Sequence, residues 1–438
     1  MPLRHRSLRD PRQHIGGLAL DCAGRGLIGD ILTTVVSASD ASVLARRLFG
    51  FSLLPIISVL SPLVALPLLA RASSVADWAS ISIGQSVGAV AAVFVGAGWN
   101  VTGPSRAARA DHGDLPDLVL ESIRGRLAAL LIAIPACVAV SAAVSIHDRP
   151  WLAAANSVGT LLPGLAVTWF AVGTGRPALM IWTDVLPRVT TNIVGAALAS
   201  ASGNLYYYPL IVVLGNLPLA AFYLRTLPST RQLVSFAAIG RNGASLGTEV
   251  LASAYSMGAT VFIGLTASVA VVAHFNAGYR LASIASVVIG VLGSTLQAWV
   301  AAANGRAFGQ RVRAAAWLHL ALGVAGWAGL IVLGPWVSRL LFGAALAPSR
   351  EVLTAFGAFF CLWSLETVTA RHVLAARERT RVLLTTTAIG SVCGIVVLIA
   401  FAQPLGAAGC AYVMTAAMAL IIATQIPACI ALIREESR

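Results

Sequence analysis

Long apolar segments separated by short polar connections are the most regular feature of this sequence. A membrane-spanning helix needs about 20 predominantly apolar residues, and about twelve segments near that length follow one another along the chain. They are apolar around most of their circumference, unlike a helix on the surface of a soluble protein. The pattern predicts an all-α polytopic membrane protein whose spans are Phe49–Leu69, Trp78–Trp99, Leu127–Ile146, Trp151–Val172, Ala178–Ala201, Tyr206–Leu224, Val250–Val272, Leu281–Ala303, Ala314–Gly334, Val352–Ala370, Val382–Ala402 and Ala407–Leu432.

The composition agrees with this pattern. Hydrophobic residues make up 58% of the 438 positions, charged residues only 11%, and the mean hydropathy is +0.84. Soluble domains have about 45–50% apolar and about 25% charged residues. So few charges cannot cover the surface of a soluble protein of this size, which excludes that class.

The distribution of arginine predicts the orientation, because the chain contains no lysine. With the N-terminus in the cytoplasm, most of the 30 basic residues, including Arg126, fall on the cytoplasmic side. Arg188 falls within a span, and the outer connections hold only Arg71, Arg149, Arg280, Arg339 and Arg350. Because cytoplasmic loops carry the excess of basic residues, we expect an inner-membrane protein with an even number of spans and both termini cytoplasmic.

The net charge of +13 does not indicate nucleic-acid binding, because the basic residues are divided among short loops and form no single face. Residues 1–48 are predicted to be a cytoplasmic tail, partly disordered. The run Gly24–Gly29 matches a dinucleotide fingerprint, but the chain enters the membrane too soon for the strand and helix that the fingerprint requires. No zinc-ligand spacing, phosphate-binding loop or nucleophile turn occurs. We therefore expect no metal and no cofactor other than a coupling ion.

Charged residues at membrane depth are the strongest indication of function, since each costs about 2.5–3.5 kcal/mol there. Arg188 lies inside the predicted span Ala178–Ala201, and Asp184 lies four residues before it, on the same helix face. One interpretation is a cationic site for an anionic substrate group, with Asp184 as counter-ion or proton carrier. The other is a self-neutralising pair that reaches toward the cytoplasmic headgroups.

Other polar residues complete the set of candidates. Glu249 and Glu366 are candidates for binding a proton or sodium ion, although Glu249 also fits a first-turn acid favoured by the helix dipole. Arg280 would lie at the external mouth or extend toward the headgroups. Polar stripes such as Ser82, Gln85 and Ser86 are spaced to line an aqueous cavity or to join helices.

Short motifs in a fixed order resemble a known family. They lie at helix exits and junctions: Ser61–Arg71, Gly96–Arg106, His274–Leu281, Leu341–Gly343 before Pro348, and Pro404–Gly409. These segments are similar to those of polysaccharide and O-antigen flippases of the multidrug/oligosaccharidyl-lipid/polysaccharide (MOP) exporter superfamily. The similarity covers the chain from about Phe49 to its end.

The resemblance implies two six-helix bundles around a central cleft: residues 49–225, a cytoplasmic linker at 226–248, and residues 249–438. It also implies a flippase that moves a polyprenyl-diphosphate-linked oligosaccharide from the inner to the outer leaflet, working with the glycosyltransferases and glycan polymerase that make the polymer. Arginine binds phosphate bidentately. We therefore expect a substrate site formed by Arg188, Arg280, Gln85, Asn276 and Gln297, with ion coupling at Asp184, Glu249 and Glu366.

Two alternatives stay open. A cation-coupled multidrug antiporter of the same superfamily should favour acidic residues in its cavity. An integral-membrane glycan polymerase or acyltransferase should have a large outer loop with clustered His, Asp or Arg. Here the outer connections are short, so we expect a transporter and not an enzyme.

Overall fold

The computed structural model describes residues 64–111, 113–145, 149–226, 234–240, 243–301 and 303–437, and every regular element in them is a helix. The predicted first span and the residues before it fall largely outside this part, as does the glycine run at residues 24–29. Eight helices of the described residues are long and apolar enough to cross a membrane. The prediction of an all-α, multi-span membrane protein is thus confirmed.

The first half of the described chain forms a set of short and long helices. These are α3 (Val75–Gly96), α4 (Trp99–Arg109), α5 (Leu115–Val144), α6 (Pro150–Leu161), η1 (Leu162–Leu165), α7 (Thr168–Gly173), α8 (Pro177–Met180), η2 (Ile181–Val185), α9 (Leu186–Ser202), α10 (Tyr207–Leu214) and α11 (Leu217–Thr226).

The second half begins after residue 233 and contains the longest helices. These are α12 (Ala237–Gly240), α13 (Gly243–Ser256), α14 (Ala259–Gly264), α15 (Val269–Ala285), α16 (Val287–Ala301), α17 (Gly305–Val332), α18 (Gly334–Phe342), α19 (Arg350–Thr367), η3 (Val368–Ala375) and α20 (Thr380–Ser437).

Helix interruptions explain why predicted spans and continuous helices do not correspond one to one. The predicted span Ala178–Ala201 is divided into α8, the π-helical turn η2 and α9, near Pro187. The span Val250–Val272 is divided between α13 and α14 at Met257 and Gly258. In contrast, α20 joins two predicted spans across Gly406, where φ 63° and ψ −174° are not helical.

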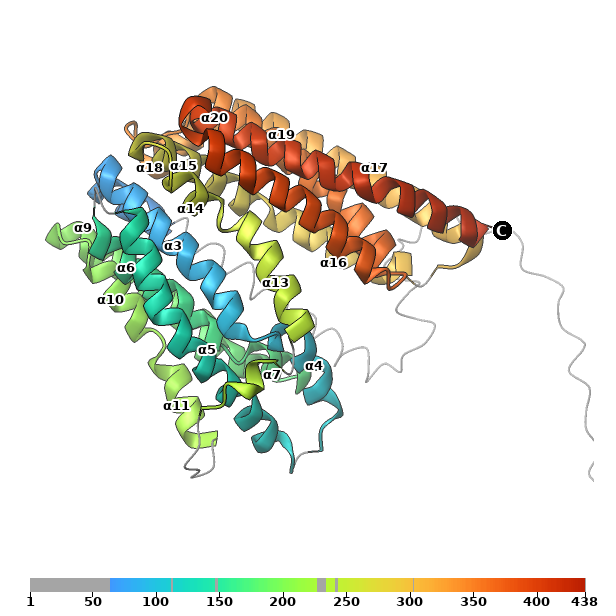
Figure 1. Cartoon of the computed structure of the whole chain (residues 1–438), viewed down its shortest axis with the longest axis horizontal. Coiled ribbons are helices and arrows are strands. Elements are labelled where there is room, and N and C mark those ends of the chain that lie inside the picture. The colour runs from blue at the N-terminus through green and yellow to red at the C-terminus, as the bar shows by residue number, and fades with distance from the viewer. Residues whose placement is uncertain are drawn as a thin grey trace, which may run out of the picture. The chain divides into compact units, whose positions relative to one another are not determined.

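Helix α3 is the central contact between the two halves. Figure 1 shows α3 among α5, α6 and α10 on one side and near α13, α14 and α15 on the other, and it packs against these last three helices. Its approach to α6 is very close: a Cβ added at Gly84 would lie 2.1 Å from the carbonyl oxygen of Ala153. Small residues allow this approach, as is common between membrane helices.

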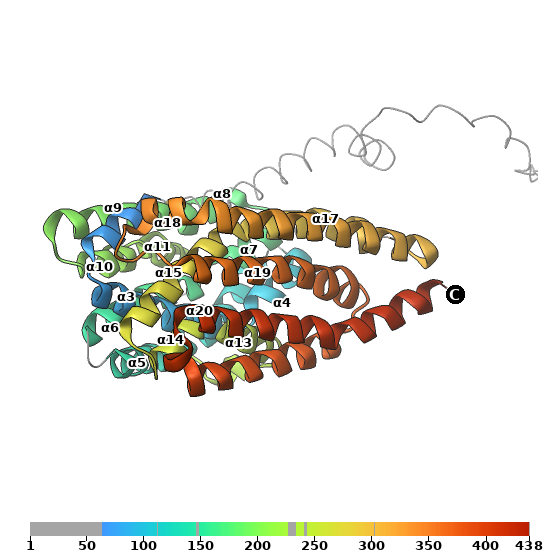
Figure 2. The same ribbon diagram turned by 90° about the horizontal axis from the view of Figure 1, so that it is seen from above.

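The helices of the second half run lengthwise beside one another. Figure 2 shows α17, α19 and α20 extending in the same direction, and α17 packs against α19 and α20. A large apolar core joins residues of both halves, including Trp78 and Ile83 of α3 and Phe275 and Phe356 of the second half. The contact between the halves is therefore a packed interface around α3.

Two expectations about connections differ from the structure. Helix α5 begins at Leu115, so Arg126 is not in a loop but within this helix, only 1% exposed. Arg280 is not in an outer connection, since α15 already begins at Val269. Polar residues suggested loops at these places, but they have polar partners within the helical packing. The described part of the predicted linker 226–248 contains α12 and the start of α13, and its role as a linker stays a prediction.

Candidate functional site

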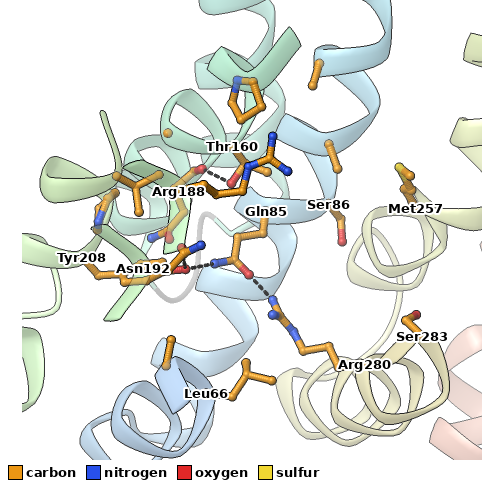
Figure 3. A pocket seen from close by; sticks show the side chains of 18 of the residues that line it. Leu66, Gln85, Ser86, Thr160, Arg188, Asn192, Tyr208, Met257, Arg280 and Ser283 are labelled. Atoms are coloured by element: carbon orange, nitrogen blue, oxygen red, sulfur yellow. Dashed lines mark hydrogen bonds between the residues drawn. The ribbon is translucent and has the colours of Figure 1, made fainter. Parts of the chain in front are cut away.

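A cavity of about 600 Å³ lies where α3, α6, α9 and α10 face α15. Its polar lining comes from both halves of the chain, as Figure 3 shows for Gln85, Arg188, Asn192, Tyr208 and Arg280. Predicted site residues that were far apart in sequence are thus brought together. Arg188, Arg280, Gln85 and Asn276 all line this one cavity.

Arg280 lies about three turns into α15. Its Nε donates to Oδ1 of Asn276, one turn earlier, at 2.7 Å, and its Nη2 donates to Oε1 of Gln85 on α3. The guanidinium also lies over the ring of Trp78, with its Cζ 5.2 Å from the centroid. All these partners are neutral, and no described acidic residue forms an ion pair with Arg280. The cavity therefore has a positive charge that the described residues leave uncompensated.

Asn276 connects Arg280 to two further helices. Asn276, which is 3% exposed, accepts from Oγ of Ser82 at 2.9 Å and donates through Nδ2 to Oγ1 of Thr260 at 3.1 Å. These contacts join α15 to α3 and α14. Asn276 therefore holds its oxygen toward Arg280 in a fixed orientation, because both the oxygen and the nitrogen of its side-chain amide have partners.

A second set of hydrogen bonds extends into the first half. Nε2 of Gln85 donates to the hydroxyl of Tyr208 at 3.5 Å, and that hydroxyl donates to Oδ1 of Asn192 at 3.0 Å. Gln85 is thus the shared residue, accepting from α15 and donating toward α10. The result is a continuous polar network across the cavity, which contains Arg280 as its only charged member among the described residues.

Arg188 has a different environment. It forms an ion pair with Asp184, one turn earlier, where π-helical η2 joins α9. The side chain of Arg188 is 39% exposed and that of Asp184 is 13% exposed, while Nε of Arg188 has no hydrogen-bond partner. Arg188 lines the cavity and Asp184 is not among the lining residues. The pair is self-neutralised, and the Nε of Arg188 is a buried donor without a partner among the described residues.

The remaining candidates do not line this cavity. Gln297 lies exposed on α16, Glu249 is half-buried on α13, and Glu366 is half-buried on α19. Their substrate-binding and ion-coupling roles stay predictions. Among the residues described, no group of three or more His, Cys, Asp or Glu side chains could hold a metal ion.

Three polar residues of the first half were not identified from the sequence. Asn192 lies four residues after Arg188, so its position on the same helix face could have indicated it. Tyr208 stood at the start of a predicted span, where aromatic residues are common, and gave no signal. Buried Arg126 donates to the carbonyl oxygen of Ala166 at 2.8 Å and to that of Gly164, where η1 interrupts the helix. It therefore satisfies carbonyl groups that the break would leave unpaired.

Comparisons with known proteins add evidence on the fold. No protein-family model matches the sequence, and no curated protein matches it significantly. Among solved structures, the lipid II flippase MurJ in an inward closed conformation matches with a TM-score of 0.68 at 15% identity, covering 88% of this chain and 89% of that one.

Multidrug transporters match as well. An inward-facing MATE family transporter of the MOP superfamily gives a TM-score of 0.59 at 16% identity, covering 87% of this chain and 99% of that one. A MATE structure in complex with MaL6 gives 0.50 at 16% identity, covering 89% and 96%. The chain shares the fold of these three structures. At this identity the likeness is one of fold alone.

Proposed function

We propose that this protein is a flippase that moves a polyprenyl-diphosphate-linked oligosaccharide from the inner to the outer leaflet of the cytoplasmic membrane. The observation that carries the proposal is Arg280, a cation in a polar cavity with only neutral partners among the described residues. A charge removed from bulk water is unfavourable without a counter-charge. An anionic substrate group would supply that counter-charge, and a diphosphate is well matched to the planar guanidinium.

The other cavity residues suit the rest of such a substrate. Arg188, which lines the same cavity, would contact the diphosphate together with Arg280. Gln85 and Asn276 present amide groups that bind sugar hydroxyls, while the isoprenoid tail would stay in the bilayer. Gln297 is left out because it lies exposed on α16 and away from the cavity lining.

The proposal includes the complete topology. Twelve spans would form two six-helix halves, with the broken helices α8–α9 and α13–α14 each crossing once, α20 crossing twice, and both termini in the cytoplasm. The cavity between the halves is where an alternating-access transporter binds its substrate. Enzymes that assemble and polymerise the glycan would be its functional partners.

A cation-coupled multidrug antiporter is the second candidate, favoured by the likeness to MATE transporters. Such a protein needs acidic groups facing its cationic substrates. None of the described residues that line the cavity is acidic, whereas two are arginines. The charge of the cavity thus supports an anionic substrate over a cationic one.

The test is to measure lipid-linked glycans in cells that lack the protein, probing each leaflet separately. We expect a polyprenyl-diphosphate oligosaccharide to accumulate on the cytoplasmic face. The wild-type gene and the control Arg339→Gln, an exposed arginine of α18, should restore its transfer. Arg280→Gln should restore it at least about 10-fold less well, since a hydrogen bond to a charged group contributes about 1.5–3 kcal/mol.

An unchanged glycolipid pool would contradict the proposal and favour drug efflux, to be examined next by drug sensitivity. Membrane abundance must be measured for each variant. If Arg280→Gln is abundant and fully active, the diphosphate assignment to Arg280 is wrong even when the flippase activity is correct.

A further inference from the structure

Two histidines in the second half form a buried pair that the cavity does not include. His319 lies on α17 and His372 on the π-helical segment η3, and both side chains are 0% exposed. Their Nε2 atoms are 3.3 Å apart, a distance at which one nitrogen donates to the other. Such a pair, 53 positions apart in sequence, is formed only by the folded chain.

The hydrogen bonds around the pair determine where its protons are. The hydroxyl of Ser364 on α19 donates to the backbone carbonyl of His319 at 2.8 Å, which uses its only proton. Nδ1 of His319, 3.0 Å from the same hydroxyl, must therefore donate to it. In neutral His319 the Nε2 is then an acceptor, so Nε2 of His372 carries the proton between the rings.

This assignment leaves Nδ1 of His372 as an unprotonated nitrogen. It is buried, and no hydrogen-bond partner approaches it. A buried polar atom without a partner is unfavourable and needs an explanation. We propose that Nδ1 of His372 is a proton-binding position, and that the His319–His372 pair is a site through which the second half of the protein responds to a proton gradient. The coupling to transport rests on the proposed function above, whereas proton binding itself does not.

Charged and ionisable groups surround the pair on several helices. The guanidinium of Arg371, the neighbouring residue, repels a positive charge on either imidazole and attracts the carboxylate of Glu366 on α19. The thiol of Cys361 faces α17 at Gly323, one turn beyond His319, and the thiol of Cys429 on α20 lies 3.8 Å from the carbonyl oxygen of Thr369.

The other charged residues on helices packed around the pair lie away from it, mostly near the helix ends. Helix α16 has no ionisable residue, and the remaining charged residues on packed helices are Arg306, Arg311 and Arg313 early in α17, Arg339 on α18, Arg350 and Glu351 at the start of α19, and Arg381, Arg434, Glu435 and Glu436 near the ends of α20.

A physical connection leads from the pair toward the cavity. Nη1 of Arg371 donates to Oγ of Ser294 on α16 at 3.2 Å, and a Cβ at Gly293 would lie 3.2 Å from the same guanidinium nitrogen. Helix α16 packs against α15, which carries Arg280. The π-helical geometry of η3 is typical of functional sites, since it departs from the usual hydrogen-bond register. A charge gained at His372 would repel Arg371 and so bias its contact with α16.

Two metal-ligand nitrogens could also lie at this separation. However, among the residues described, no third His, Cys, Asp or Glu completes a metal site with the pair. The proton is therefore the ligand that we propose, and a metal ion is one of the outcomes of the test.

The experiment uses the purified full-length protein and the variant His372→Gln. The glutamine amide can occupy the position of Nε2 and still donate to His319, but it offers no basic nitrogen at the position of Nδ1. Imidazole ¹⁵N spectra of histidine-labelled protein, recorded between about pH 8 and about pH 3, should show a buried histidine that gains a second proton. That signal should be absent from His372→Gln and unaffected by a zinc chelator.

Transport in proteoliposomes then tests the coupling. An imposed proton gradient should change wild-type flux several-fold, and His372→Gln should remove this dependence while the protein stays folded. The variant His372→Asn cannot reach His319, so its thermal stability measures how much the hydrogen bond between the two residues stabilises the fold. Three results would overturn the proposal. The His372 signal could fail to titrate, it could change when the chelator is added, or His372→Gln could keep the dependence of flux on the proton gradient. If the wild type moves no glycolipid, the proposed function fails, while the ¹⁵N titration still decides whether the proton site exists.

Discussion

The cavity around Arg280 and the buried cluster around His319 are both polar sites within an apolar protein, but they satisfy their polar groups differently. Arg280 lines an open space and has neutral partners from both halves of the chain. The histidines lie in the buried interior of one half, where protein groups satisfy every polar atom of the two rings except Nδ1 of His372. The comparison teaches that the cavity offers a cation in an open space of about 600 Å³, whereas the buried pair offers a single nitrogen without a partner.

Charge reversal at the cavity should have the largest effect. Arg280→Glu would place a carboxylate against Gln85 and Asn276 and make the cavity repel anions, since opposing like charges cost several kcal/mol. We expect binding of polyprenyl diphosphate to fall by roughly 100-fold or more. The measurement is a binding titration of the purified variant, with Arg339→Glu as the control. Undiminished binding would show that the diphosphate is held elsewhere.

Removal of the Ser364 hydroxyl should destabilise the buried His319–His372 pair and leave the cavity unchanged. Ser364→Ala deprives Nδ1 of His319 of its acceptor, and an unsatisfied buried group costs about 1–3 kcal/mol. We expect a lower thermal unfolding temperature with diphosphate binding unchanged. A change in binding without a change in stability would mean that the two sites are not separate.

Neutralising Asp184 should have a smaller effect, and it should strengthen diphosphate binding instead of weakening it. The pair with Arg188 is partly exposed, and such pairs contribute up to about 1 kcal/mol. Asp184→Asn would release Arg188, and diphosphate binding should become about 2- to 5-fold tighter. The double variant Asp184→Asn with Arg188→Gln should lose this gain. Weaker binding in Asp184→Asn would instead assign Asp184 a positioning role.

Gln297 should contribute least. Its side chain is exposed on α16 and does not line the cavity, and substitutions of this kind change stability by about 0.5 kcal/mol or less. Gln297→Ala should match the wild type in both binding and transport rate. A clear loss of transport would restore the role expected from its place in a polar stripe and would extend the site toward α16.

The membrane fold could be predicted from sequence because it depends on composition and segment length. Where the prediction differed, polar residues were the reason. Arg126 was placed in a loop because arginine is rarely buried, but Tyr223 and two freed carbonyl oxygens accept its hydrogen bonds within the packed helices. The span Ala178–Ala201 contains the π-helical turn η2, a departure that apolar periodicity does not reveal.

The candidate site could be predicted only as a set of residue types. Polar residues in apolar segments are costly in free energy and are therefore usually functional. This argument identified Arg188, Arg280, Gln85 and Asn276. The sequence favoured Arg188 over Arg280, because Arg188 lay well inside a predicted span. His319 and His372 gave no signal, since each is a single histidine in an apolar segment.

By itself, the sequence determined that this chain crosses the membrane many times and which polar side chains enter the apolar interior. Whether a segment can cross the membrane depends on the length of its own apolar run, which is a local property of the sequence. Only the tertiary structure decided which charges are compensated. Arg188 meets its acid one helical turn away, but Arg280 meets Gln85 across 195 positions and the two histidines meet across 53. The charge of a site depends on such distant partners, because electrostatic interactions act through space and not along the chain.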